Sequence, residues 1–218
     1  MIGSNPFAEL SSFISPSTMQ TFVIIMAALV IVGVVLDLIH KKSATYFFLN
    51  AEKAKEASTR TVGGGEKIAI AVQTVVVDVL TSGEFHNQQR RLAHMLKMLG
   101  FITFLVTSVL LIFSISTSPM VATLWHVGAM MVTVGGLWFW FALRVNGSSE
   151  GASWTTVVKG DAFILSLIGT NLFGLLWSFT QSKVFFALFV LSAIILFGGV
   201  RWSKFAHMFF KPAAAFQK

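Results

Sequence analysis

Long apolar stretches alternate with short polar segments along this chain, and the alternation predicts transmembrane helices. A helix that crosses the hydrocarbon core of a bilayer needs about 20 mostly apolar residues. Five stretches approach that length, so the pattern predicts an all-α integral membrane protein, a five-helix bundle forming one membrane domain over residues 1–218. The expected spans are residues 19–39, 92–116, 121–143, 162–180 and 184–210. We expect tight links between neighbouring spans at "TSP" (Thr117–Pro119) and "TQSK" (Thr180–Lys183).

The distribution of Lys and Arg predicts how these spans are oriented. Residues 1–19 contain neither residue type. The basic residues gather between the first and second spans, between the third and fourth, and after the fifth, whereas the opposite side carries only Lys183. Cytoplasmic loops of membrane proteins are enriched in Lys and Arg. We therefore expect a multi-pass protein of the inner (cytoplasmic) membrane with its N-terminus outside and its C-terminus in the cytoplasm.

The segment 41–91 is the only long polar part of the chain, and it is expected to be a cytoplasmic loop. Its "VGGGEK" (Val62–Lys67) lacks the GxxxxGK[ST] spacing of a phosphate-binding loop, so it is interpreted as a turn. The following "KIAIAVQTVVVDVL" (Lys67–Leu80) is too short to span a membrane. A helix lying along the membrane interface or against a partner is favoured, because an isolated strand has little to pair with.

Composition narrows the class of protein. Only 11% of the residues are charged, against roughly 25% in soluble domains. The net charge of +7 is therefore interpreted as the basic excess that orients spans, and nucleic acid is not expected as a partner. The absence of Cys excludes a cysteine-ligated iron–sulfur cluster and a covalently attached c-type haem. Any electron-carrying cofactor must then be bound non-covalently through His or Met.

Two of the five histidines stand out because they lie near the same side of the predicted bundle. His94 lies at the start of the second span, in "RRLAHMLKMLGF", and His207 lies near the end of the fifth, in "RWSKFAHMFFKP". Two neutral imidazoles on opposed helices are the usual way to hold an electron-transferring haem b. Two unrelated histidines at the membrane rim are the alternative. His40 and His86 lie in polar surroundings and are interpreted as solvated rim residues.

The depth of His207 sets a condition on this pair. His207 is seven positions after Val200, about 10 Å along a helix at 1.5 Å per residue. A haem site at this depth requires the fifth span to continue as a helix to residue 210, with basic side chains extending to the interface. The basic residues near the pair are candidate partners for haem propionates, although ordinary flanking charge explains them equally well. These candidates are Arg90, Arg91, Lys97, Arg201 and Lys204.

The segments "VVVDVLTSGEFHNQQRRLAHMLKMLGFITFLVTS" and "RWSKFAHMFFKP" together resemble the membrane cytochrome b of the nitrate reductase gamma-subunit-like group. The resemblance covers residues 20–212 and is closest to membrane subunits of quinone-interacting and heterodisulfide-reductase-like complexes of sulfur metabolism. It implies a haem b with His94 and His207 as axial ligands, quinone as substrate, and a cytoplasmic iron–sulfur or flavin oxidoreductase as partner. Adenylylsulfate reductase is one partner that it suggests.

The chain also departs from the two-haem pattern of that group. Where the group has a second histidine in each ligand-bearing span, this sequence has Thr103 and Phe104, and the apolar stretch Phe186–Val190. The resemblance therefore implies one haem, near the cytoplasmic side. Some relatives carry a cysteine-rich iron–sulfur domain that this chain lacks, so its electrons are expected to pass through a separate subunit.

The third span carries an intramembrane histidine, His126, which is a candidate to hydrogen-bond a quinone carbonyl. An imidazole bonded to a neighbouring carbonyl or hydroxyl group is the alternative. Gly135 and Gly136 predict close helix packing, and Trp138 and Trp140 predict an aromatic belt at the interface.

The expected function is a membrane subunit that transfers electrons between a cytoplasmic oxidoreductase and the quinone pool. The haem and quinone would supply the redox chemistry, and the protein would position them. A haem-free anchor that only recruits a soluble enzyme is the alternative. A small transporter is disfavoured, because the sequence has no inverted repeat and few charges within its spans.

Overall fold

The computed structural model describes residues 2–41, 49, 52–53, 56, 63–73, 87–144 and 155–201. Within these residues the chain is all-helical, as predicted. The elements are η1 (Ala8–Ser12), α1 (Pro16–Lys41), α3 (Gly64–Gln73), α4 (Gln88–Ile112), α5 (Pro119–Trp138), the π-helical turn η3 (Phe139–Leu143), η4 (Lys159–Asp161), α6 (Ala162–Thr180), α7 (Lys183–Gly198) and η5 (Gly199–Arg201).

Four of these helices are long and apolar enough to cross a membrane. They are α1, α4, α5 with its π-helical turn, and α6. The fifth, α7, is a shorter apolar helix of 16 residues that continues into the 3-10 turn η5. The prediction of an all-α protein with membrane-spanning helices is confirmed in this form. Residues 202–210 of the expected fifth span lie outside the described part of the chain.

The second span begins and ends about four residues earlier than its apolar pattern suggests. Its first turn is polar, yet it is helical because Asn87 caps it: the Asn87 side chain accepts hydrogen bonds from the backbone N–H groups of Gln89 and Arg90 at 2.9 and 3.2 Å. The helix ends at Ile112, and Ser114 then adopts a left-handed conformation with φ of 55°. The capping side chain, rather than hydropathy, sets where α4 begins.

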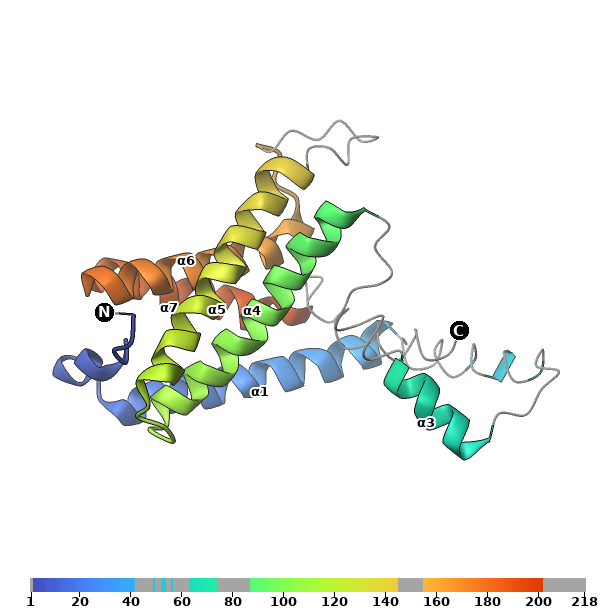
Figure 1. Cartoon of the computed structure of the whole chain (residues 1–218), viewed down its shortest axis with the longest axis horizontal. Coiled ribbons are helices and arrows are strands. Elements are labelled where there is room, and N and C mark those ends of the chain that lie inside the picture. The colour runs from blue at the N-terminus through green and yellow to red at the C-terminus, as the bar shows by residue number, and fades with distance from the viewer. Residues whose placement is uncertain are drawn as a thin grey trace.

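The segment 64–73 is the helix α3, so the helical interpretation of "KIAIAVQTVVVDVL" is confirmed over residues 67–73. The turn interpretation of "VGGGEK" is wrong for its last four residues, which form the first turn of α3. Figure 1 shows α3 beyond the end of α1, away from the crossing helices. Ile68 and Val72 lie four positions apart, which places them on one side of the helix, and they are 68% and 57% exposed.

The five long helices form two antiparallel hairpins with α1 packed at one side. The helix α4 pairs with α5, α6 pairs with α7, α5 joins the hairpins by packing on α6, and α1 lies against α7. In Figure 1, the α4–α5 pair crosses the other three helices obliquely. The N-terminal segment, the α4–α5 link and the α6–α7 link lie at one end, here named the N-terminal end. The other end, where α4 and α6 begin and α5 and α7 finish, is named the basic end.

The core has two parts, one near each end of the bundle. Near the N-terminal end, Phe7 of the N-terminal segment packs on Trp125 of α5 and Trp177 of α6, with ring centroids 5.7 and 5.4 Å apart. Near the basic end, a second cluster includes Trp140, which is only 6% exposed. The aromatic-belt prediction is therefore wrong for Trp140, which packs inside the protein and does not face lipid.

The backbones of α4 and α5 approach closely where both helices carry glycine. A Cβ atom added to Gly128 would lie 2.8 Å from the Gly100 carbonyl oxygen and 2.8 Å from the Phe104 backbone nitrogen. Gly135 and Gly136 make similarly tight approaches to Leu96 and Ile168, so the prediction of close packing at this pair is confirmed. Small residues serve this purpose in membranes because lipid tails provide no hydrophobic force that pushes helices together.

We expect Gly128→Ala to destabilise the bundle, because the new methyl group must push α4 and α5 apart. The free energy of unfolding should fall by about 1–3 kcal/mol, the usual cost of overpacking. Gly198→Ala is the matched control, since a Cβ atom there meets nothing within 4 Å. Its stability should be unchanged or higher by up to about 1 kcal/mol, owing to the better helix propensity of Ala. Thermal unfolding in detergent measures both, and equal effects would refute the close approach.

Candidate functional site

His94 borders a cavity of about 290 Å³ at the basic end of the bundle. Its side chain is partly buried, three residues from Lys97 on the same helix. Most of the cavity wall is apolar, and the polar groups are His94, Lys97 and Asp161. The remaining lining residues come from α4, the π-helical turn, η4 and the start of α6: Met98, Phe101, Phe139, Gly160, Phe163, Ile164 and Leu167.

The side of α4 that carries His94 faces the second hairpin, α6 and α7. Phe101 lies two turns after His94 on α4, and residues seven positions apart share a helix face. The ring of Phe101 stacks on Phe197 of α7, with centroids 6.3 Å apart. His94 therefore lies on the side of α4 that faces the second hairpin, and the cavity beside it is lined by the start of α6. His207 itself, like His86 and Lys204, lies outside the described residues.

The basic side chains of α4 are engaged with the end of α5. Arg90 donates a hydrogen bond to the Leu143 carbonyl oxygen at 3.2 Å, and the Lys97 ammonium group lies 4.0 Å from the centre of the Phe139 ring. Both partners belong to the π-helical turn, which is closed by a bond of 2.8 Å from the Arg144 N–H to the Phe139 carbonyl oxygen. Single π-helical turns often occur at functional sites.

The ends of α5 and α6 are joined by an ion pair that sequence reasoning missed. Arg144 follows the π-helical turn and pairs with Asp161, and both side chains are about 13–14% exposed. Arg144 also donates to the Thr156 carbonyl oxygen at 2.7 Å, and its guanidinium lies 4.2 Å from the centre of the Trp140 ring. Asp161 accepts a further bond of 2.9 Å from the Val158 N–H. This network, named the Arg144–Asp161 clasp, forms one edge of the cavity at His94.

The structure places the remaining propionate candidates at or near the same end. Arg91 is partly buried and has an interaction of its own within the protein. Arg201 closes η5 at the end of α7, so its backbone lies at the basic end, while the placement of its side chain is outside the described part of the structure. Arg90, Arg91 and Lys97 are thus brought together with His94 on α4, as their spacing predicts.

His126 is fully buried near the N-terminal end and has both ring nitrogens hydrogen-bonded. Nδ1 lies 2.7 Å from the Ala122 carbonyl oxygen, and Nε2 lies 2.7 Å from Ser178 Oγ on α6. Because a carbonyl oxygen only accepts, Nδ1 carries a proton, and the Ser178 hydroxyl donates to Nε2 of the neutral ring. The internal bonding that sequence analysis kept as an alternative is present. A quinone carbonyl would reach this imidazole only by taking the place of Ser178.

No family model, curated protein or solved structure matches this chain. Its function therefore has to be inferred from the arrangement of its own side chains.

We expect Asp161→Asn to destabilise the protein, because it leaves the partly buried Arg144 cation without its counter-charge. The free energy of unfolding should fall by about 1–3 kcal/mol, less than for a fully buried pair. The double variant Arg144→Met with Asp161→Leu should recover much of that loss, since two apolar groups need no partner in this setting. Thermal unfolding of the two variants and the parent checks this, and a double variant less stable than Asp161→Asn contradicts it.

Proposed function

We propose that this protein is a haem b-containing membrane subunit that transfers electrons between a cytoplasmic oxidoreductase and the quinone pool. One observation carries the proposal: His94 borders an apolar-walled cavity, on the side of α4 that faces the second hairpin, where Phe101 contacts Phe197 of α7. In this proposal His94 and His207 are the two axial ligands. The resemblance to membrane cytochromes b supports the same pair of residues.

The described residues fit one side of a haem site. A macrocycle needs apolar walls, and the cavity offers Phe101, Phe139 and Leu167. Haem propionates need cationic partners, and Lys97 lines the cavity with Arg90 one helical turn away from His94. The single carboxylate in the wall, Asp161, is already paired with a guanidinium, so it adds little negative charge to repel a propionate.

Each of these side chains has a defined task in the proposal. A bis-imidazole haem b supplies one-electron transfer at its iron. His94 must be neutral to act as an axial ligand. Lys97 would turn from the Phe139 ring toward a propionate. The Arg144–Asp161 clasp would hold the start of α6 against the end of α5 and so keep water out of that side of the cavity.

The helix ends nearest to His94 and His207 in the sequence lie at the same end of the bundle, which supports this pair. The beginning of α4 and the end of α7 are both at the basic end (Figure 1). His207 follows Arg201, the last residue of η5, by six positions in the sequence. In the proposed orientation this end faces the cytoplasm, where an iron–sulfur or flavin subunit would dock. An enzyme of sulfur metabolism such as adenylylsulfate reductase is the partner that the resemblance favours.

The haem-free anchor is the second candidate, and α3 supports it. This helix presents Ile68 and Val72 outside the bundle, with no described helix covering them. Apolar side chains in such a position suit the membrane interface or the surface of a bound enzyme. An anchor would use α3 in this way and would need no cavity at His94.

A reduced-minus-oxidised spectrum of the purified protein separates the two candidates. The cytochrome proposal predicts a b-type α band and about one haem per chain by pyridine haemochrome assay. His94→Ala and His207→Ala should each remove at least nine-tenths of the bound haem, because either change takes away an axial ligand.

His40→Ala provides the matched control, since His40 is next to the last residue of α1 and has no assigned role. Its haem content should equal that of the parent protein. A parent protein with no α band would sink the cytochrome proposal and leave the anchor. A normal haem content in His94→Ala would show instead that the ligand assignment is wrong.

A further inference from the structure

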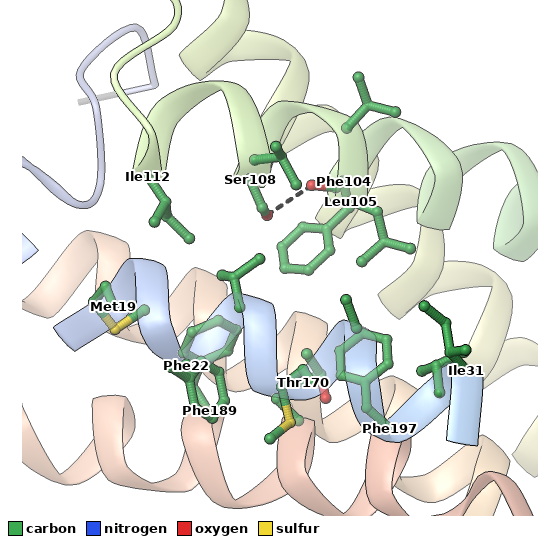
Figure 2. A pocket seen from close by; sticks show the side chains of 17 residues that line it. Met19, Phe22, Ile31, Phe104, Leu105, Ser108, Ile112, Thr170, Phe189 and Phe197 are labelled. Carbon is green, nitrogen blue, oxygen red and sulfur yellow. Dashed lines mark hydrogen bonds between the residues drawn. The ribbon is translucent and has the colours of Figure 1, made fainter. Parts of the chain in front are cut away.

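A second cavity, of about 470 Å³, lies between α1 and the helices α4, α6 and α7. Figure 2 shows its walls: Met19, Phe22 and Ile31 of α1 face Phe104, Leu105 and Ile112 of α4. Phe189 and Phe197 of α7 form the floor. The cavity exists because α1 packs on α7 and makes few contacts with α4. It contains no histidine, so it offers no axial ligand to a second haem.

The polar side chains in the wall already form hydrogen bonds within the protein. Ser108 Oγ donates to the Phe104 carbonyl oxygen at 2.7 Å and accepts from Trp125 Nε1 at 2.9 Å. Thr170 Oγ1 donates to the Ser166 carbonyl oxygen at 2.8 Å. No side chain that lines the cavity therefore has an N–H or O–H left to donate, and a quinone head group would find no partner for its carbonyl oxygens. The cavity suits hydrocarbon alone.

The shape of the cavity matches a single chain. On α1 it extends from Met19 to Ile31, which is about 18 Å along the helix. Its volume divided by that length gives a mean cross-section of about 26 Å², about 5–6 Å across. A packed helix with its side chains is about 10–12 Å wide, so the cavity is too narrow to enclose a helix from a partner protein.

The cavity begins near the membrane surface and is open along one side. Met19 lies in the first turn of α1, at the N-terminal end of the bundle. Lining residues at the rim remain exposed to the surrounding bilayer: Ile31 is 65% exposed and Val106 is 54% exposed. A lipid whose head group lies at that surface would run its tail parallel to α1, which is the direction of the cavity.

We propose that this cavity, named the α1–α4 groove, holds one acyl chain of a membrane phospholipid with its head group at the N-terminal end. The bound chain fills the space between α1 and the rest of the bundle and so joins α1 to α4. The proposal is independent of haem binding, because the groove shares only helices, and no cavity, with the site at His94.

Ala27→Phe tests the proposal, because Ala27 lines the groove and a benzyl group there would occupy the path of the chain. Its neighbour Ala28 is exposed and does not line the groove, so Ala28→Phe is the matched control. The readout is native mass spectrometry of detergent-purified protein, with lipid extraction and phosphate analysis. We expect a tightly held phospholipid in the parent and in Ala28→Phe, and at least a fivefold loss in Ala27→Phe.

A second pair of variants approaches the groove from its floor on α7. Ala193 lines the groove, so Ala193→Leu should narrow it, whereas Ala187 is on the same helix but does not line the groove. We expect Ala193→Leu to lose phospholipid as Ala27→Phe does, and Ala187→Leu to retain it as Ala28→Phe does. This pair keeps the test decisive if Ala27→Phe fails to fold. Equal phospholipid in all folded variants, no retained phospholipid in the parent, or a retained quinone in place of phospholipid would each overturn the proposal.

Discussion

The contact between the backbones of α4 and α5 is the constraint on which the rest of the structure depends. Inside a bilayer, helices gain little from hiding apolar surface, so their association depends on close fit. Gly100 and Gly128 provide that fit and fix the rotation of α4 about its own axis. With Gly100 and Ala93 turned to α5, the side bearing His94 and Phe101 must turn toward the second hairpin. The absence of side chains at Gly100 and Gly128 therefore determines which helices His94 faces.

The apolar pattern predicted most of the fold, because hydrocarbon-length stretches have few alternatives to helix in a membrane. The features that the apolar pattern did not predict depend on polar side chains. Asn87 begins α4 inside a stretch that looks like loop, and the Arg144–Asp161 clasp joins residues seventeen positions apart, across a segment with no hydrophobic signal. Single-sequence reasoning had no means to pair those two charges. It also placed Trp140 in the aromatic belt, whereas the Arg144 guanidinium covers the Trp140 ring.

The candidate site was predicted in part for a similar reason. Helical spacing alone brought Arg90, His94 and Lys97 to one end of α4, and that grouping is present. The cavity beside them depends on Phe139, Asp161 and Leu167, whose approach requires the tertiary packing of three helices. For His126 the sequence suggested a functional role, because a histidine within a membrane span is often part of a site. In the structure its ring is hydrogen-bonded to Ala122 of α5 and Ser178 of α6, so it links these two helices.

The buried Phe7 has a consequence for how the molecule is assembled. The ring rests on Trp125 and Trp177, and Leu10 beside it is only 3% exposed, yet these tryptophans are synthesised long after the N-terminal segment. The segment around Phe7 must therefore remain without these partners until α6 has been synthesised. Closure of this end is a late event in folding, because a segment made before α1 finds its native contacts only after α6 has been made.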